Sequence, residues 1–418
     1  MEYKKYTTEK RNLLENIHQF IDEESTLKEK LNVFIRYLQT NNYEENIVEF
    51  KLILHTINNI SNNHHRYQTF LMKIKEFLKY YSEYIKKHFT DYEIFNIFQN
   101  NKLILHFLIQ NKIITVNKNI ANLIIQKDEK EEKQFHSYFV KDREKALKYF
   151  KRNTTYNYCY YFFHEIQSFL REEKRTQIER ELFEKHNYNS DEFENNRQIG
   201  ENESYICQLI RQDSIKEFVI YINQNNIQFS SEINHSIFET NHFLLKRNTS
   251  LIEYAAFFGS IQIFQYLQLN NSEMTSHLWL FAIHGKNPEI IQILIENNIK
   301  PEDDTYVECL QESIKCHHND IANYIIDNLM PLNIEINEEN FIFNKHAFGF
   351  HYHNYEFIQN FQNYQFIFYY ACLFDYFTIV KLLVSENKIN LTLKIIKNQQ
   401  FFYPINIYVK TKLFFIQF

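Results

Sequence analysis

Glycine and proline are scarce in this chain, with four of each among 418 residues. An average sequence carries about 12% of the two together. Tight hairpins depend on glycine or on Asn-Gly pairs, so the scarcity argues against a large antiparallel sheet. The glycines are also too dispersed for the Gly-x-Gly loop that holds a nucleotide's phosphates. They stand at Gly200, Gly259, Gly285 and Gly349.

Long apolar runs are missing as well. No stretch of 18 apolar residues occurs, and the longest candidate, around Tyr370, is short and contains Asp375. We therefore expect no membrane span. The N-terminus lacks the apolar core of a signal peptide, and the five cysteines form no Cys-x-x-Cys pair. These features favour a reduced compartment, the cytoplasm first and the nucleus second.

An excess of positive charge is absent. The chain has 46 basic and 52 acidic residues and a net charge of −6. It offers no field that would attract a phosphate backbone, so nucleic-acid binding is not expected. The longest charge run, Lys127 to Lys133, mixes both signs. We interpret it as a solvated helix end.

Helical periodicity dominates what is present. In the segments 27–38, 47–57 and 70–85, the apolar residues recur on one helical face. The breaks between these segments are short and polar, which predicts antiparallel neighbouring helices. The stripes consist of Leu27, Leu31, Phe34, Ile35 and Leu38, then Ile47, Phe50, Leu54 and Ile57, then Phe70, Ile74, Phe77, Leu78, Tyr81 and Ile85.

Asparagine recurs just after apolar helical runs. A residue that tolerates left-handed backbone is needed where a helix ends, and asparagine follows glycine in that preference. The pattern therefore predicts asparagine C-caps in a chain almost without glycine. The tetrads are Gln110–Ile113, Gln224–Ile227, Glu296–Ile299 and Glu386–Ile389, with a looser copy at Leu269–Asn271.

One template recurs in the C-terminal half. A small residue is followed four positions on by a turn, and eight positions on by an apolar pair, as in Ala255, Gly259 and Ile263-Phe264. Further copies predict turns at Lys286, His317 and Asp375. This spacing indicates helical hairpins with loose loops, and Gly259 marks the turn between two helices. A helix start at Asn287-Pro288 agrees with the template.

The stretch from Thr249 to Leu267 resembles the ankyrin repeat signature. Thr249 and Leu251 match its opening, Ala255-Ala256 its alanine pair, and Gly259 its glycine. More narrowly, the chain resembles an expanded set of ankyrin-like proteins of unknown function from parasitic protists. The blocks Ile60–Arg66, Ser250–Phe264 and Glu312–Ile325 carry this second match. The ankyrin resemblance implies an α-solenoid whose concave face and loops bind other proteins. The family shares no catalytic residues, so none is transferred.

The expected fold is all-α: an elongated α-solenoid of antiparallel helical hairpins, ankyrin-like in its C-terminal half. We divide the chain into an N-terminal hairpin array (1–130), a charged helical connector (131–200), degenerate ankyrin-like repeats (201–397) and an irregular tail (398–418). The usual Gly-Ala-Asp after the second helix is replaced by Asn-Asn or Asn-Lys, which predicts short or irregular loops between the hairpins.

Two residue groups suggest chemistry. The three histidines His346, His351 and His353 are close enough in sequence to suggest a zinc site, but no carboxylate or second shell is evident nearby. Cys316 beside His317 is the one adjacent thiol–imidazole pair, and a structural role is favoured for both residues. We therefore expect no catalytic, cofactor-binding or metal-binding residues.

The function expected is that of a non-enzymatic protein–protein interaction module, an ankyrin-like scaffold or adaptor. The partner is expected to be a protein. Neither its identity, the binding residues nor the oligomeric state follows from the sequence. Two alternatives stay open. One is an enzyme or metal-binding protein with an unrecognised site, and the other is a structural or decaying gene product without a specific partner.

Overall fold

The computed structural model describes residues 2–22, 27–66, 69–139, 158–186, 188–302, 304–330, 338–358 and 363–389. The irregular tail expected from Asn398 lies outside these ranges. The secondary structure of the described residues is helical, without a strand, and a single isolated bridge joins Glu232 to Ser250. The all-α expectation is confirmed for them. Within these ranges, no helix combines the length and apolarity needed to cross a bilayer.

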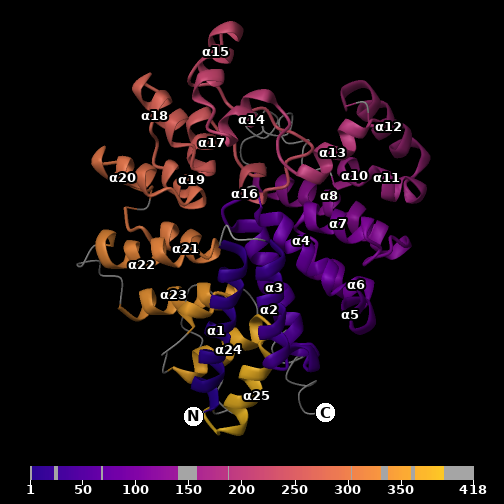
Figure 1. Ribbon diagram of the computed structural model, residues 1–418, viewed down its shortest axis with the longest axis vertical. Coiled ribbons are helices and arrows are strands. Elements are labelled where there is room, and N and C mark those ends of the chain that lie inside the picture. The colour runs from indigo at the N-terminus through magenta and orange to yellow at the C-terminus, as the bar shows by residue number, and fades with distance from the viewer. Residues whose placement is uncertain are drawn as a thin grey trace. The chain divides into compact units, whose positions relative to one another are not determined.

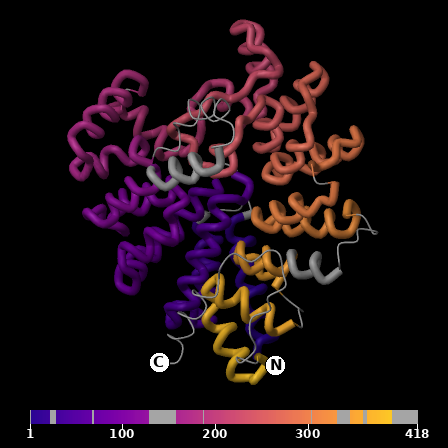
Figure 2. The backbone as a smooth tube through the Cα atoms, turned by 180° about the vertical axis from the view of Figure 1, so that it is seen from behind, coloured from indigo at the N-terminus to yellow at the C-terminus, as the bar shows by residue number. Residues whose placement is uncertain are grey.

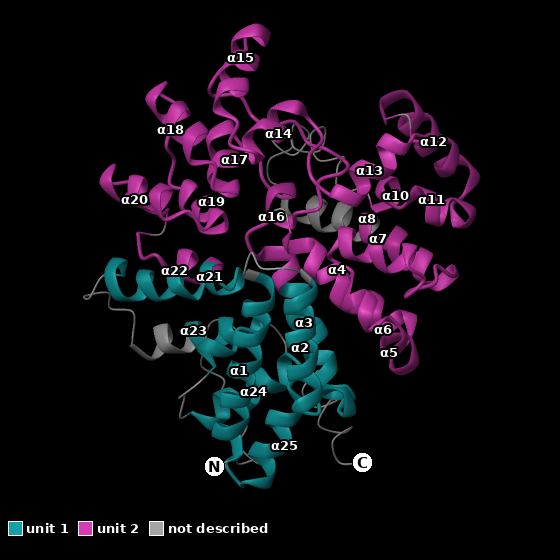
Figure 3. Cartoon of the chain, in the orientation of Figure 1, with its two compact units in different colours: residues 1–59, 313–418 teal, residues 60–312 magenta. Residues whose placement is uncertain are grey.

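The chain forms two compact units (Figure 3). Unit 1 combines Met1–Asn59 with Ser313–Phe418, and unit 2 is Ile60–Glu312. The two boundaries fall inside α3 (Ile47–Asn63) and α21 (Val307–Lys315). Unit 1 is therefore built from the two ends of the chain.

Unit 1 places its first helix against its last ones. Helix α1 packs against α2, η5 and α25, and Figures 1 and 2 show the indigo and yellow ends together from both sides. The backbone N–H of Glu2 donates to Glu386 over 2.9 Å, and Arg11 pairs with Glu356 at 2.8 Å. Besides α3, the elements are α1 (Glu2–Asp22), α2 (Leu27–Thr40), η1 (Tyr43–Glu45), α22 (Asn319–Tyr324), the π-helical η4 (Ile325–Leu329), α23 (Glu338–His351), η5 (Tyr355–Phe357), α24 (Tyr364–Leu373) and α25 (Phe377–Ser385).

Unit 2 begins with a series of helices. These are α4 (Phe70–Tyr80), α5 (Ser82–His88), α6 (Asp91–Phe98), α7 (Lys102–Gln110), α8 (Lys118–Phe139), α10 (Tyr158–Tyr161), α11 (Phe163–Ile166), η3 (Gln167–Phe169), α12 (Glu172–His186) and α13 (Asp191–Ile199). Of this series, α8 and α12 are the longest. The apolar stripe predicted over 70–85 is divided between α4 and α5. Its residues are buried as expected, but the backbone of Tyr81 departs from helical dihedral angles, with φ of −87° and ψ of 11°.

Three helical hairpins follow within unit 2. The first helices of the hairpins, α14, α17 and α19, pack in a row, and the second helices, α15, α18 and α20, form another row (Figure 1). The hairpins are α14 (Tyr205–Arg211) with α15 (Ile215–Asn225), α17 (Leu251–Phe258) with α18 (Ile261–Leu269), and α19 (Leu278–Gly285) with α20 (Pro288–Glu296). The short α16 (His242–Leu245) precedes the second hairpin.

The predicted turn positions all adopt left-handed backbone. Gly259 has φ of 68°, and Lys286, His317 and Asp375 have φ of 52°, 59° and 63°. Asp213, in the hairpin of α14 and α15, has φ of 49°. The turn geometry is therefore kept where glycine is lost, and the template prediction of a turn there is confirmed.

The asparagine caps are confirmed at four of the five predicted helix ends. Left-handed backbone occurs at Asn226, Asn271, Asn298 and Asn387. After α7 the prediction is wrong, because Lys112 and not Asn111 has the positive φ, at 55°. The side chain of Asn111 donates to the carbonyl of Phe107 over 2.8 Å, as Asn225, Asn270 and Asn297 do at other helix ends. In each case the next residue is the left-handed one, and after α7 that residue is a lysine.

The charge run Lys127–Lys133 lies inside α8, and its interpretation as a solvated helix end is wrong for one member. Asp128 is buried and accepts hydrogen bonds from the backbone N–H groups of Tyr158 at 2.8 Å and Cys159 at 3.0 Å. A buried carboxylate needs such donors, and the first turn of α10 supplies them.

Candidate functional site

One open cleft lies on unit 2, where loops meet the first turns of successive helices. We call it the loop cleft; its volume is about 370 Å³. Three chain segments line it, each consisting of a loop and the helix start that follows. The lining residues are Lys246, Arg247, Asn248, Glu253, Ser276, His277, Trp279, Leu280, Phe281, Pro301, Glu302, Glu308 and Cys309.

The polar groups at the floor of the loop cleft already form hydrogen bonds within the protein. Glu253 and Ser250 form a capping box, with Ser250 Oγ donating to the Glu253 carboxylate over 2.9 Å. Trp279 is buried, and its indole N–H donates to the carbonyl of Ile299 over 2.7 Å. These groups hold the walls together, because each polar atom named already has a partner within the protein.

The rim of the loop cleft carries both signs of charge. His277 and Glu302 are exposed and lie 3.5 Å apart. The Arg247 guanidinium lies over the Phe243 ring at 4.0 Å. The loop before α17 is supported by backbone hydrogen bonds to the preceding loop, from Ile233 N–H to Thr249 over 2.7 Å. The rim therefore offers a mixed polar surface on a braced loop.

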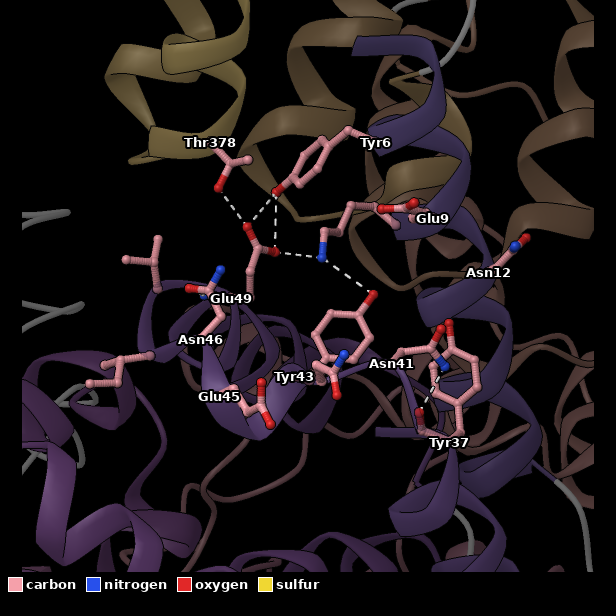
Figure 4. A pocket seen from close by; sticks show the side chains of 14 residues that line it. Tyr6, Glu9, Asn12, Tyr37, Asn41, Tyr43, Glu45, Asn46, Glu49 and Thr378 are labelled. Carbon is pink, nitrogen blue, oxygen red and sulfur yellow. Dashed lines mark hydrogen bonds and ion pairs between the residues drawn. The ribbon is translucent and has the colours of Figure 1, made fainter. Parts of the chain in front are cut away.

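A second cleft, the helical cleft, lies within unit 1 and has a volume of about 690 Å³ (Figure 4). Helix α1, the end of α2, the loop through η1 and the first turn of α3 form its walls, and α25 adds one residue. The lining residues are Tyr6, Glu9, Lys10, Asn12, Tyr37, Asn41, Asn42, Tyr43, Glu45, Asn46, Ile47, Val48, Glu49 and Thr378.

A buried polar network forms the floor of the helical cleft. Lys10 Nζ lies 2.5 Å from Glu49, and the Lys10 ammonium also donates to Tyr43 Oη over 3.3 Å. The hydroxyls of Tyr6 and Thr378 donate to Glu49 over 3.1 and 2.5 Å. These five side chains come from α1, η1, α3 and α25, and Figure 4 shows Tyr6, Tyr43 and Thr378 around Glu49. The carboxylate is thus compensated by one ammonium and two hydroxyls.

Burial and neighbouring charges in this network shift the pKa values of its members. Burial lowers the pKa of Lys10, while the Glu49 carboxylate opposes that shift. Burial raises the pKa of Tyr6 well above its ordinary value, and the neighbouring Glu49 adds to the effect. The tyrosine therefore stays protonated and acts as a donor.

The three histidines considered as zinc ligands contact different partners. His346 Nδ1 lies 2.5 Å from the carbonyl of Phe357. His351 stacks on Phe374 with ring centroids 4.9 Å apart. His353 stacks on His55 of α3 and has Nδ1 2.9 Å from the Tyr376 hydroxyl. Their neighbours in this part of unit 1 are a carbonyl, aromatic rings and a hydroxyl.

Cys316 and His317 are both buried. His317 Nε2 lies 2.8 Å from the carbonyl of Tyr352 and 3.2 Å from the Asn59 amide. Its backbone is left-handed at the turn after α21. The imidazole thus takes part in packing between turns of unit 1.

Sequence reasoning missed the Lys10–Glu49 pair and a buried pair in unit 2, where His284 lies 2.6 Å from Glu312. One signal for Lys10 was available. It falls on the stripe of α1 that also buries Tyr6, Leu13 and Leu14, and a lysine on an apolar stripe requires a partner. No local pattern, however, connects position 10 to position 49.

Comparison with protein-family models, curated proteins and solved structures finds no match to this chain.

Proposed function

We propose that this chain is a non-enzymatic protein–protein interaction module, and that its hairpins from about residue 201 form an ankyrin-like solenoid. The observation that carries the proposal is the loop cleft. It is lined by loops and first-helix starts of successive hairpins, which is where the ankyrin resemblance places partner binding.

The chemistry of the loop cleft supports a protein as the ligand. Its floor is apolar and aromatic, with Trp279, Leu280 and Phe281 buried, and its rim is polar. Protein interfaces have this pattern of an apolar centre within a polar rim. Glu253, the one carboxylate of the floor, is held by the capping box and is not free to act as a base.

The test is affinity capture from the source cell with the full chain and matched variants. The change Lys246→Glu combined with His277→Glu reverses the charge at one exposed rim position and adds a carboxylate at another. We expect the partner to be retained by the wild-type chain and by the control Arg175→Glu, an exposed change on α12, and to be lost by the double variant.

Thermal melting of each variant accompanies the capture and checks that the fold is intact. Equal recovery of the same proteins by the wild-type chain and by a folded double variant would contradict binding at the loop cleft.

A further inference from the structure

At the floor of the helical cleft in unit 1, the charge of the Glu49 carboxylate is already balanced by neighbouring side chains. Lys10 is committed to Glu49 at 2.5 Å and to Tyr43, and the hydroxyls of Tyr6 and Thr378 complete the carboxylate's partners. A ligand therefore meets the rim residues, and the recognition chemistry is set by them.

The rim of the helical cleft is acidic. Across the lining, three carboxylates (Glu9, Glu45 and Glu49) face one ammonium (Lys10), which is bound to Glu49. Glu9 and Glu45 are exposed and come from different walls, α1 and η1, as Figure 4 shows. Glu9 pairs with Lys5 at 3.9 Å on the exposed face of α1, a contact that solvent screens strongly, and its charge also acts weakly on Lys10. This rim disfavours phosphates and acidic segments and favours a cation.

Apolar surface adjoins the acidic rim. Ile47 and Val48, in the first turn of α3, line the helical cleft with 44% and 42% of their surface exposed. Phe377, next to Thr378, is 37% exposed. These side chains leave a substantial part of their apolar surface in contact with solvent, so a ligand that covers them gains apolar contact.

Four asparagines complete the rim, at Asn12, Asn41, Asn42 and Asn46. An amide side chain both donates and accepts hydrogen bonds, as a peptide backbone does. The rim thus combines groups for a backbone, a cation and an apolar side chain.

We propose that the helical cleft binds an extended peptide segment of a partner protein, one that carries lysine or arginine next to an aliphatic or aromatic residue. The cationic side chain lies between Glu9 and Glu45, and the apolar residue covers Ile47 and Val48. Charge complementarity selects this occupant over an acidic peptide or a nucleic acid. The site lies in unit 1 and is separate from the loop cleft of the proposed function, so either can fail without the other.

The test is fluorescence anisotropy on the full chain with two labelled hexapeptides. One alternates lysine with isoleucine, and the other alternates glutamate with isoleucine. We expect the lysine peptide to bind and the glutamate peptide not to bind. In the double variant Glu9→Gln with Glu45→Gln, the Kd of the lysine peptide should rise about ten-fold at low salt, and less at high salt.

A matched control distinguishes loss of charge within the helical cleft from a change in the net charge of the protein. Glu15→Gln with Glu192→Gln removes the same two charges at exposed positions outside the helical cleft, and we expect less than about a two-fold change. Val48→Ser tests the apolar part and should weaken the lysine peptide several-fold without shifting the melting temperature.

Three outcomes overturn the proposal. The lysine peptide does not bind, or it loses affinity equally in the cleft variant and the control variant, or the cleft variant alters the sedimentation of the protein on its own. The last result would assign the helical cleft to a second copy of this chain.

Discussion

At the scale of single residues, two glycines are constrained by the same helix contact. An added Cβ at Gly285 would lie 2.0 Å from the carbonyl oxygen of Ala256, and one at Gly259 would lie 2.7 Å from the carbonyl oxygen of Gly285. The backbones of α17 and α19 touch here, so a scarce residue is used where a side chain cannot fit.

Replacing Gly285 with alanine should therefore cost about 3 kcal/mol of unfolding free energy, because the obstructing atom is backbone and cannot rotate away. Urea unfolding measures this. The neighbouring Lys286→Gly is the control, since it relieves a left-handed lysine and should stay within about 1 kcal/mol of wild type. Equal effects of the two changes would contradict the close approach of α17 and α19.

The half-buried His55 should make unit 1 sensitive to acid. Burial and the Lys51 ammonium lower the pKa of His55 to about 4, against a smaller opposing effect of Asp375. The unfolded chain titrates at about pH 6.5. Between these values the unfolded state binds more protons, so stability present at neutral pH is lost as pH falls from 6.5 towards 4.

We expect this loss to be about 1 to 3 kcal/mol for His55. Urea midpoints at pH 7 and pH 4.5 measure it, and His55→Gln should show a shallower decline over the same interval. A variant with the same pH slope as wild type would rule out His55 as a contributor.

At the scale of elements, helix starts also join neighbouring hairpins. Asn287 caps α20 through Oδ1, which accepts from Glu289 N–H at 2.9 Å. Its Nδ2 donates to the carbonyl of Gly259 over 2.9 Å. One side chain thus ends the turn after α19 and fixes it to the turn after α17, a second role that the sequence pattern of a cap with Pro288 does not include.

The two roles can be separated. Asn287→Ala should cost about 2 kcal/mol, because both the cap and the donor to the Gly259 carbonyl are lost. Asn287→Asp keeps the cap and loses the donor, so we expect it to recover about 1 kcal/mol. Thermal unfolding of both variants checks this; identical losses would mean that only the amide donor matters.

At the scale of the whole molecule, unit 1 depends on segments from both ends of the chain. Glu49 receives Lys10 from α1 and Thr378 from α25, which are 368 residues apart (378 − 10). Removing the ammonium leaves a buried carboxylate without its counter-charge.

Lys10→Met should thus destabilise unit 1 by about 3 to 5 kcal/mol, and adding Glu49→Gln should restore much of the loss by neutralising the carboxylate. Hydrogen exchange of the backbone amides shows which helices are destabilised. We expect faster exchange in α1, α2 and α25 and unchanged exchange in α17 to α20, which belong to unit 2. Faster exchange in α17 to α20 would contradict the division into units.

The sequence by itself determined what depends on neighbouring residues. Helical stripes, the left-handed turns at Gly259, Lys286, His317 and Asp375, and most asparagine caps follow from local backbone preferences and side-chain spacing. The helix break at Tyr81 and the left-handed Lys112 were missed, because several residues near a helix end tolerate the same geometry and packing selects among them.

Only the tertiary structure decided which distant residues meet. The Lys10–Glu49 network, the stacking of His55 on His353, the burial of Asp128 against α10 and both clefts arise from contacts between segments far apart in the chain. Local periodicity specifies which face of a helix is apolar, but it carries no information about which other face will cover it. Burial of a charge then depends on the partner that the fold brings to it.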